Sequence, residues 1–292
     1  MESRRALKIA PIQGLLPSAA MSDAAYQQSR YRALEIEHRY GSRVHLLDDP
    51  LAWTLLGRAC APEVGQPEVG RLVASLYALL VHVVLAAELP RERISAKTRM
   101  VTQHPAEGVY RGTALARDTK VVTVDIARAG TLPSQVVYDA LNTILDPSGV
   151  RQDHLFMSRV TNDKGEVTGA EWHDAKIGRD VEGRYVFFPD PMGATGTSMV
   201  SAMRHYAERL EGKPRAMIAL NLIVTPEYLR RVTEELPDAQ VYALRLDRGL
   251  SPAAVLATTP GARWDEERGL NAVQYIVPGA GGVGEVLNNA WI

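Results

Sequence analysis

The segment Val121–Ile126 constrains the fold more than any other part of this 292-residue chain. It is mostly β-branched and almost continuously apolar, which is typical of a strand buried on both faces of a parallel sheet. Similar apolar runs follow later in the chain, at Tyr185–Phe188, Met217–Val224 and Val241–Leu246. Helical segments alternate with these runs, at 132–145, 197–210 and 226–236. This alternation predicts an α/β fold with a mainly parallel sheet flanked by helices.

Shorter elements are expected between these runs. Further strands are predicted at Thr98–Val101, Val109–Thr113 and Leu155–Met157, and the polar stretch Thr161–Asp180 is interpreted as a loop or ribbon. In an open α/β sheet, ligands bind outside the carboxyl ends of the strands. The unusual turns after Ile126, Met157 and Phe188 all fall at such ends, so the functional site is expected at that edge.

Composition and charge exclude some classes of function. With 46% hydrophobic and 23% charged residues, the chain resembles an ordinary soluble globular protein. Its 33 basic and 34 acidic residues give a formal charge of -1, which supplies no electrostatic footprint for nucleic acid. The single cysteine, Cys60, cannot form an internal disulfide and is interpreted as a packing residue in a reducing compartment.

No targeting or membrane segment is expected. Two prolines and a glutamine interrupt the stretch after the charged N-terminus, which argues against a secretory signal. The most apolar run, Leu72–Leu89, is marginal against the about 20 apolar residues that a bilayer requires. We interpret it as a buried or subunit-contacting helix and expect a cytoplasmic protein. Residues 1–45 are interpreted as an N-terminal extension and residues 46–292 as the folded domain.

A nine-residue loop connects the strand Tyr185–Phe188 to a helix, and its residues are Asp190, Pro191, Met192, Gly193, Ala194, Thr195, Gly196, Thr197 and Ser198. Free backbone N–H groups and the positive end of a helix dipole make such a turn an anion site. Gly196 lets the backbone approach a phosphate closely, and the hydroxyls of the loop add donors. The carboxylate of Asp190 is placed to accept hydrogen bonds from sugar hydroxyls.

A helix that is merely capped after a strand would show the same residues, because Thr and Ser are common N-caps. No Gly-Lys pair follows the loop, so binding of a nucleoside triphosphate through a Walker A motif is disfavoured.

The loop closely resembles the Asp-Pro-Met-x-Ala-Thr-Gly-x-Ser signature of uracil phosphoribosyltransferases. Three other segments are similar to that family in the same order along the chain: Arg128-Ala129-Gly130, Met157-Ser158-Arg159 and Tyr275-Ile276-Val277-Pro278-Gly279. The resemblance covers about residues 46–292. It implies a type I phosphoribosyltransferase fold with a C-terminal base-binding hood. It also implies transfer of ribose 5-phosphate from phosphoribosyl pyrophosphate (PRPP) to a heterocyclic base.

The resemblance implies roles for individual residues. In the family, the loop binds the ribose and 5′-phosphate of PRPP, a role that falls here to residues 190–198. The arginine of the Arg-Ala-Gly turn contacts pyrophosphate, so Arg128 is expected to neutralise the leaving group, and Arg159 has a similar task. Together with Asp190, these two arginines are the implied catalytic residues. Thr197 stands where the family usually has glycine and adds a hydroxyl.

The resemblance also implies a magnesium ion that arrives with the substrate. Many other phosphoribosyltransferases place two acids at the start of the loop, whereas Pro191 replaces the second acid here, as in the uracil enzymes. The metal is therefore expected to be held mainly by substrate oxygens. No His/Cys cluster in the sequence has the spacing of a protein metal site.

The C-terminal base-binding element departs from the family pattern. Where the family has Pro-Gly-Leu-Gly-Asp-Ala-Gly-Asp, this chain has residues 278–285, in which Gly282 replaces the first aspartate and Glu285 replaces the second. Glycine cannot supply a carboxylate, while contacts made by the backbone need no particular side chain. The base-binding residues that the resemblance implies are Ile276, Gly281, Gly282 and Val283.

Two further departures concern the same neighbourhood. Ser158 stands where the family usually has tyrosine. The family's short Asp-x-Gly-Leu-Asn hood begins at Asp247 and resumes at Gly269, so the segment 251–268, with Trp264, interrupts it. We expect this segment near the base pocket; a harmless surface insertion is the alternative.

Three functions remain open on the sequence. The first is a phosphoribosyltransferase that acts on uracil or a related heterocycle. The others are a biosynthetic transferase with a non-uracil acceptor and a non-catalytic sensor of PRPP or a nucleotide. Retention of Arg128 and Arg159 favours an enzyme, and loss of the carboxylate at Gly282 favours the alternatives. The apolar helix and the family resemblance lead us to expect a homodimer or higher oligomer.

Overall fold

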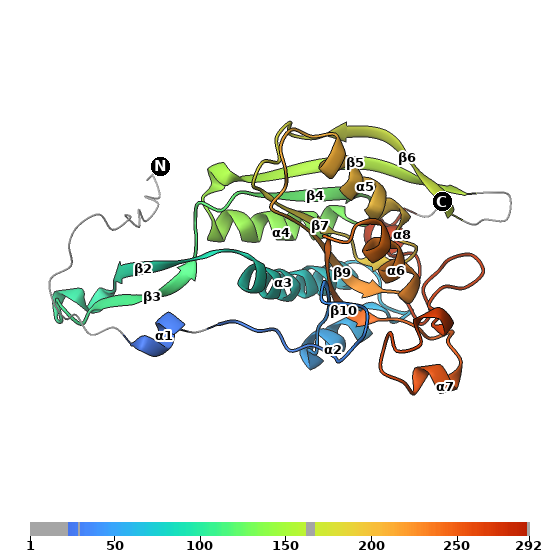
Figure 1. Cartoon of the computed structure of the whole chain (residues 1–292), viewed down its shortest axis with the longest axis horizontal. Helices are drawn as coiled ribbons and strands as arrows, with labels where there is room; N and C mark the ends of the chain where they lie inside the picture. The colour runs from blue at the N-terminus through green and yellow to red at the C-terminus, as the bar shows by residue number, and fades with distance from the viewer. Residues whose placement is uncertain (1–22, 29, 162–166, 291–292) are drawn as a thin grey trace. The chain divides into compact units, whose positions relative to one another are not determined.

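A computed structural model of the chain describes residues 23–28, 30–161 and 167–290 (Figure 1). The side chains of residues 158–161, 167–170 and 172 lie outside the described part. Contacts between Cα atoms divide the chain into two compact units. One comprises Met1–Arg32 with Glu88–Ala116, and the other comprises Ala33–Ala87 with Arg117–Ile292.

The smaller unit is built on a two-stranded antiparallel ribbon. Its elements are α1 (Ala24–Gln28), β2 (Arg91–Lys97), a 3₁₀ turn (Arg99–Thr102) and β3 (Val109–Leu115). The strand predicted at Val109–Thr113 is confirmed, whereas the one predicted at Thr98–Val101 is wrong. The Thr98 hydroxyl accepts a hydrogen bond from the Met100 N–H (3.2 Å) and so caps the 3₁₀ turn. This local side-chain bond competes with strand pairing.

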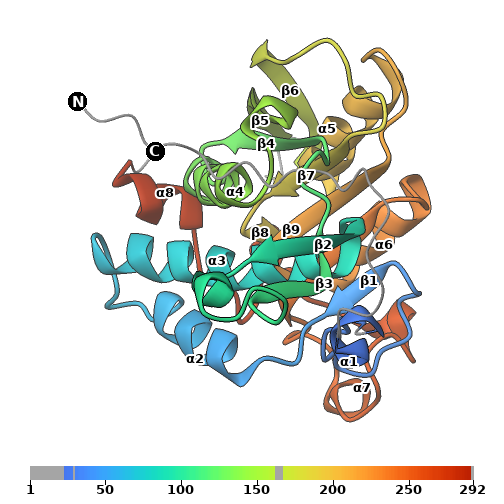
Figure 2. The same cartoon turned by 90° about the vertical axis from the view of Figure 1, so that its left-hand side faces the viewer.

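The larger unit contains an eight-stranded sheet, and its strands run parallel except for the last pair. The strands are β1 (Val44–Leu46), β4 (Val121–Ala127), β5 (Val150–Thr161), β6 (Val167–Lys176), β7 (Tyr185–Pro189), β8 (Met192–Gly193), β9 (Ala216–Val224) and β10 (Gln240–Leu246). Their order is β1-β10-β9-β7-β4-β5-β6, with β8 beside β9; only β6 is antiparallel to its neighbour (Figure 2). The predicted α/β class is confirmed.

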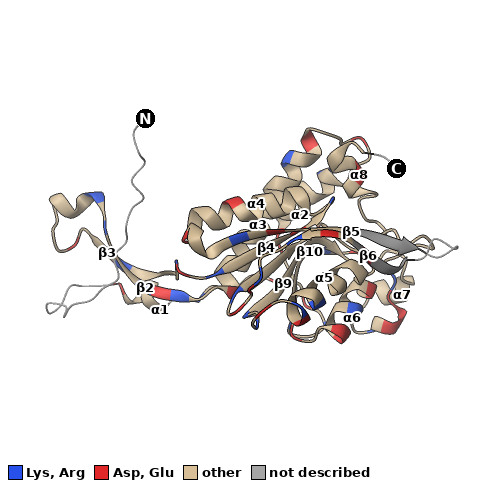
Figure 3. Ribbon diagram, turned by 90° about the horizontal axis from the view of Figure 1, so that it is seen from above, with Lys and Arg blue, Asp and Glu red and all other residues tan. Residues whose placement is uncertain are grey.

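Helices cover both faces of this sheet. The longer ones are α2 (Pro50–Ala59), α3 (Glu68–Glu88), α4 (Thr131–Ile144), α5 (Thr197–Glu208) and α6 (Pro226–Glu235). The first three lie on one face and the last two on the other (Figure 3). All six residues of Val121–Ile126 are buried, as predicted. Their alternate side chains Val122, Val124 and Ile126 join the core cluster beneath α5 and α6.

The predicted apolar helix is present as α3. It is long and apolar enough to cross a membrane by length and composition alone, and half of its most apolar window is buried inside the structure. Leu76, Tyr77 and Leu80 have no exposed surface. One side of α3 therefore packs in the core, and subunit contact on the remainder stays a prediction.

Two expectations about extended segments need adjustment. The short strand predicted at Leu155–Met157 is the middle of the much longer β5, and most of the stretch predicted as a loop or ribbon forms β6 against it. β1 crosses the predicted boundary at residue 45 and pairs with β10. The boundary at residue 45 stays a prediction, although the compact unit includes residues from Ala33.

The two halves of the interrupted hood meet at one residue. The Gly249 N–H donates to the Val277 carbonyl (3.0 Å), and the Val277 N–H donates to the Gly269 carbonyl (2.8 Å). The Leu250 N–H then donates to the Arg268 carbonyl (3.1 Å), which closes the base of the inserted segment. The insertion therefore leaves and rejoins the hood without separating its halves.

The inserted segment packs around a buried carboxylate. Glu267 is 1% exposed and accepts hydrogen bonds from Arg248 Nη1 (2.7 Å), the Gly261 N–H (2.9 Å) and the Tyr40 hydroxyl. Desolvation by burial and the Glu267 carboxylate raise the pKa of Tyr40 far above its ordinary value, so this hydroxyl remains a donor. The insertion contains α7 (Ala253–Leu256) and a 3₁₀ turn (Trp264–Glu266).

We predict that Glu267→Ala lowers the free energy of unfolding by about 3–5 kcal/mol, because it removes the only carboxylate paired with the largely buried Arg248 guanidinium in the described structure and leaves it only carbonyl acceptors. Urea denaturation monitored by far-UV circular dichroism measures this change. The matched control is Glu266→Ala, which removes the neighbouring carboxylate from an exposed pair with Arg263 and should leave stability near that of the wild type. Equal stability of the two variants would contradict the role of Glu267.

Candidate active site

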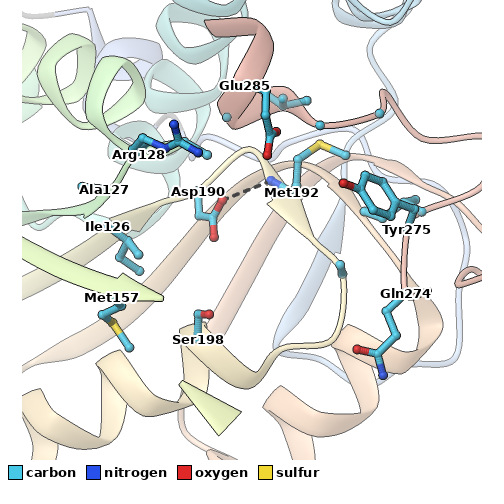
Figure 4. A pocket seen from close by; sticks show the side chains of 17 residues that line it. Ile126, Ala127, Arg128, Met157, Asp190, Met192, Ser198, Gln274, Tyr275 and Glu285 are labelled. Carbon is cyan, nitrogen blue, oxygen red and sulfur yellow. Dashed lines mark hydrogen bonds between the residues drawn. The ribbon is translucent and has the colours of Figure 1, made fainter. Parts of the chain in front are cut away.

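A cavity of about 580 Å³ lies at the carboxyl ends of β4 and β7 and beside Met157 in the middle of β5. Seventeen residues line it, at 126–129, 157, 190, 192, 194, 198, 274–276 and 281–285 (Figure 4). They come from the turn after β4, the strand β5, the loop after β7 and the C-terminal segment. The site therefore lies at the edge that the sequence predicts.

None of the lining residues belongs to the inserted segment 251–268, so the segment does not form part of the cavity wall, and its expected position near the base pocket stays a prediction. Other anchors hold the segment. The Trp264 indole N–H donates to the Pro226 carbonyl (3.0 Å) on α6, and the Arg230 guanidinium lies 5.0 Å from the centre of the Trp264 ring.

The loop after β7 is fastened to the buried sheet beneath it. The Asn221 side-chain amide, fully buried on β9, donates to the Asp190 carbonyl (2.7 Å), and its oxygen accepts from the Tyr228 hydroxyl (3.0 Å). Burial and the nearby charge of Asp190 raise the pKa of both Tyr228 and Tyr77 well above the ordinary value. Both hydroxyls therefore remain donors.

The middle of the loop needs glycine for close packing. A side chain at Gly193 would begin 2.9 Å from Val224 Cγ1 and 3.0 Å from the Tyr228 ring, so the backbone could not lie as near to β9. The Gly193 carbonyl accepts from the Thr225 N–H (3.0 Å), and the Thr225 hydroxyl donates to the Ala194 carbonyl (2.6 Å). These contacts fix the path of the loop towards α5.

The end of the loop forms the N-terminus of α5. Gly196 is its N-cap with φ +80°, a left-handed conformation that favours glycine. The Thr197 N–H donates to the Thr195 hydroxyl (3.4 Å), and the two hydroxyls lie 3.2 Å apart. The first N–H groups of a twelve-residue helix and its positive dipole end meet these hydroxyls, as an anion site requires.

Arg231 of α6 also reaches this end of the loop, and sequence reasoning missed it. Its guanidinium donates to the Thr197 hydroxyl, and its stem lies beside Gly196. Arg231 also contacts Glu235 (3.6 Å), four residues later on α6. The only signal in the sequence was the unusual threonine at position 197, which gives this arginine its acceptor.

The turn after β4 presents Arg128 to the cavity. The Ala127–Arg128 peptide bond is cis, and Arg128 Nη1 donates to the Ala290 carbonyl (3.2 Å). Asp125 supports the turn from beneath: it is 3% exposed, accepts from the Thr131 hydroxyl (3.1 Å) and contacts His154 Nδ1 (2.9 Å). Thr131 begins α4, so Asp125 ties both ends of the Arg128 turn together.

The predicted loop residues divide into two groups. Asp190, Met192, Ala194 and Ser198 line the cavity, whereas Pro191, Gly193, Thr195, Gly196 and Thr197 shape the loop behind it. Met157 also lines the cavity. Arg159 lies two residues further along β5, and its side chain is outside the described part.

All four predicted base-binding residues line the same cavity: Ile276, Gly281, Gly282 and Val283. A side chain at Gly282 would begin in contact with Glu285 Oε2, so the Glu285 carboxylate lies beside the place that glycine leaves open. Among the described residues, no hydrogen bond or ion pair occupies this carboxylate. Glu285 is the third residue of α8 (Val283–Asn288), and helical spacing brings it back towards Gly282.

Fold and site together define a phosphate-binding α/β protein with a pocket between the sheet edge and a C-terminal segment. The sequence profile of the family "Uracil phosphoribosyltransferase" matches residues 47–262. The chain belongs to the uracil phosphoribosyltransferase family. It is therefore a pentosyltransferase, an enzyme that transfers a phosphoribosyl group from PRPP to a base.

Individual relatives agree with this assignment. The uracil phosphoribosyltransferase of Variovorax paradoxus is 28% identical over 245 residues, which cover 84% of this chain and 97% of the relative. That of Shouchella clausii is 29% identical over 245 residues, with the same coverage. The solved structure of the AQ2163 protein from Aquifex aeolicus has a similar fold. Its TM-score is 0.63 at 20% identity, over 84% of this chain and 97% of that one.

The family profile ends at residue 262, before the C-terminal part of the cavity. Arg128 and the loop 190–198 lie inside the matched range, whereas the base-binding residues 276 and 281–283 lie outside it.

We predict that Gly196→Ala weakens PRPP binding by about fivefold or more, because alanine at φ +80° costs about 1–2 kcal/mol and shifts the loop. Steady-state kinetics with varied PRPP measures the effect as a rise in KM. Gly183→Ala is the matched control, since Gly183 has φ +64° in open space at the start of β7, away from the cavity lining. If both variants bind PRPP alike, the loop does not depend on Gly196.

Proposed function

We propose that this enzyme transfers ribose 5-phosphate from PRPP to uracil or a related heterocycle and releases pyrophosphate. One observation carries the proposal: residues of the loop 190–198 (the phosphate loop), Arg128 and the C-terminal segment line one cavity. The loop offers an anion site for the 5′-phosphate, and the C-terminal segment offers backbone groups to a flat ring. The space between them accommodates the ribose.

In the proposed reaction, a ring nitrogen of the base attacks the anomeric carbon of the ribose, and the bond to pyrophosphate breaks. Negative charge builds on the leaving group while the ribose becomes cation-like. Fixed positive groups and backbone dipoles stabilise such a transition state, because they need no reorganisation as the charge develops. Arg128 and Arg159 supply positive charge to the pyrophosphate, and the Asp190 carboxylate accepts from the ribose hydroxyls.

The magnesium ion belongs to the substrate in this proposal. Asp190 and Glu285 line the cavity, and each has carboxylate oxygens. In proteins, Mg²⁺ is usually bound by one or two carboxylates together with phosphate oxygens and water. Bound to pyrophosphate, the ion supplies further neutralisation of the leaving group. No group of three His, Cys, Asp or Glu side chains in the described ranges could hold a metal ion by itself.

A second candidate function is transfer to a non-uracil acceptor. The observation that favours it is the arrangement at Gly282, where the Glu285 carboxylate stands beside an absent side chain. The acid at this place comes from Glu285 on α8, and not from position 282 just before the helix. The base half therefore differs from the family pattern in its acidic residues, while the loop 190–198 departs from the family signature only at Thr197.

Incubation with PRPP, Mg²⁺ and a panel of pyrimidine and other heterocyclic bases tests the proposal. Pyrophosphate release with uracil supports the first function, and release only with another base supports the second. PRPP binding without release in the whole panel would refute both.

The homo-oligomer, the cytoplasmic location and the absence of nucleic-acid and membrane partners stay predictions.

We expect Arg128→Ala to lower turnover by about two to three orders of magnitude, which corresponds to about 2.7–4 kcal/mol of transition-state stabilisation. Pyrophosphate release at saturating PRPP measures it, and Arg159→Ala should act in the same direction. Arg43→Ala, which removes an exposed arginine paired with Asp238, is the control and should keep full turnover. Unchanged turnover in both site variants would remove the pyrophosphate role.

The acid at the base half gives a further prediction. Gly282→Asp should lower turnover with the native acceptor, because the new carboxylate lies against that of Glu285 and like charges repel. Adding Glu285→Ala to Gly282→Asp should recover part of the loss, since a single acid then remains. PRPP affinity should change little in either variant. Kinetics across the base panel, analysed as a double-mutant cycle, measures the coupling between positions 282 and 285. Higher uracil turnover in Gly282→Asp alone would refute the proposal that Glu285 takes the place of the missing acid at position 282.

A further inference from the structure

An ion pair that does not line the cavity lies directly behind the base-binding segment. Arg245, near the end of β10, contacts Asp247 through both carboxylate oxygens, with Nε to Oδ1 at 2.6 Å and Nη2 to Oδ2 at 2.8 Å. The Asp247 side chain is 2% exposed and that of Arg245 is 26% exposed. Two parallel hydrogen bonds of this kind hold a guanidinium and a carboxylate in one plane.

Both partners of this pair also bind the backbone of Gly279. The Gly279 N–H donates to Asp247 Oδ2 (2.7 Å), and the Gly279 carbonyl accepts from Arg245 Nη2 (3.1 Å). The peptide groups on the two sides of one residue are thus held by one rigid pair. On the opposite side, Arg245 Nη1 contacts Cys60 Sγ (3.8 Å) at the end of α2. This contact orients the guanidinium from behind.

Gly279 occupies a critical place in the C-terminal segment. It lies between Ile276 and Gly281, two of the residues that line the base half of the cavity. Its φ is +63°, and a side chain there would collide with the Ile276 carbonyl. The chain therefore turns sharply at Gly279, and the direction of that turn sets where the backbone groups of residues 281–283 point.

We propose that the Arg245–Asp247 pair is the positioning element of the base half of the site. The pair fixes the turn at Gly279 and thereby holds residues 276–283 in the geometry that binds the acceptor. It acts through the backbone and touches neither substrate. The inference rests on the proposed function, since that function makes this segment the acceptor subsite.

The chain contains a closely matched pair away from the site. Arg151 contacts Asp153 at the start of β5, with Nε to Oδ1 at 2.9 Å and Nη2 to Oδ2 at 3.1 Å, at 23% and 2% exposure. This pair also binds backbone, accepting from the Gly178 N–H (3.1 Å) and donating to the Asp180 carbonyl (2.8 Å). Arg151 lies six residues and Asp153 four residues before Met157, about 20 Å and about 13 Å along an extended strand.

The test compares Arg245→Lys with Arg151→Lys. Lysine keeps the positive charge but cannot form the planar double hydrogen bond. If the acceptor segment then adopts its binding geometry about a tenth of the time, the acceptor KM rises about tenfold. The KM for PRPP and the turnover at saturating acceptor should stay near the wild-type values in Arg245→Lys, and Arg151→Lys should change none of these constants.

Hydrogen–deuterium exchange supplies a readout that does not need turnover. Arg245→Lys should accelerate exchange of backbone amides in residues 276–283, and Arg151→Lys should accelerate it only near residues 178–182. If the wild-type enzyme uses no base in the panel, the proposed function fails. In that case, faster exchange confined to residues 276–283 in Arg245→Lys would still show that the Arg245–Asp247 pair holds the backbone at Gly279.

Several results would overturn the proposal. They are an unchanged acceptor KM in Arg245→Lys, a parallel rise of both KM values, or the same change in Arg151→Lys. Asp247→Asn, which keeps the side-chain size, serves as the second variant if Arg245→Lys does not fold. Failure of both to fold, with Arg151→Lys folded, would make the pair a requirement of the fold and would also refute a positioning role.

Discussion

The hydrogen bond from the Asn221 amide to the Asp190 carbonyl is the contact on which the geometry of the site depends. It joins the phosphate loop to the fully buried centre of the sheet, and Tyr228 satisfies the other polar atom of the same amide. Moving the loop would leave these groups buried without partners, at a penalty of about 1–3 kcal/mol each. The loop is therefore held in place before any ligand arrives.

The two halves of the cavity are supported in different ways. The PRPP half lies on strands and on the N-terminus of α5, so sheet pairing and core packing define it. The base half is a C-terminal segment held at Gly279 by side chains of another strand. Because the supports are separate, residues 280–285 can change without disturbing the loop 190–198. The departures from the family pattern at Gly282 and Glu285 fall in the half that can change.

Sequence patterns predicted what depends on neighbouring residues. The burial of Val121–Ile126, the order of strands and helices, and the loop 190–198 all follow from short-range periodicity and turn chemistry. Patterns could not reveal that Arg231 reaches Thr197 from α6. This contact is a property of tertiary packing. The anchors of the segment 251–268, Tyr40 and Pro226, were hidden from sequence patterns in the same way, because they lie far away along the chain.

The contact between Tyr40 and Glu267 joins the beginning of the larger unit to its end. Residues 33–46 add the edge strand β1 and also supply the hydroxyl that helps to satisfy a carboxylate in the C-terminal insertion. A chain shortened to begin at residue 46 would lose both at once. Glu267 lies 227 residues after Tyr40 in the sequence. The start of this folding unit is therefore set by a contact with a distant residue and not by a change in composition.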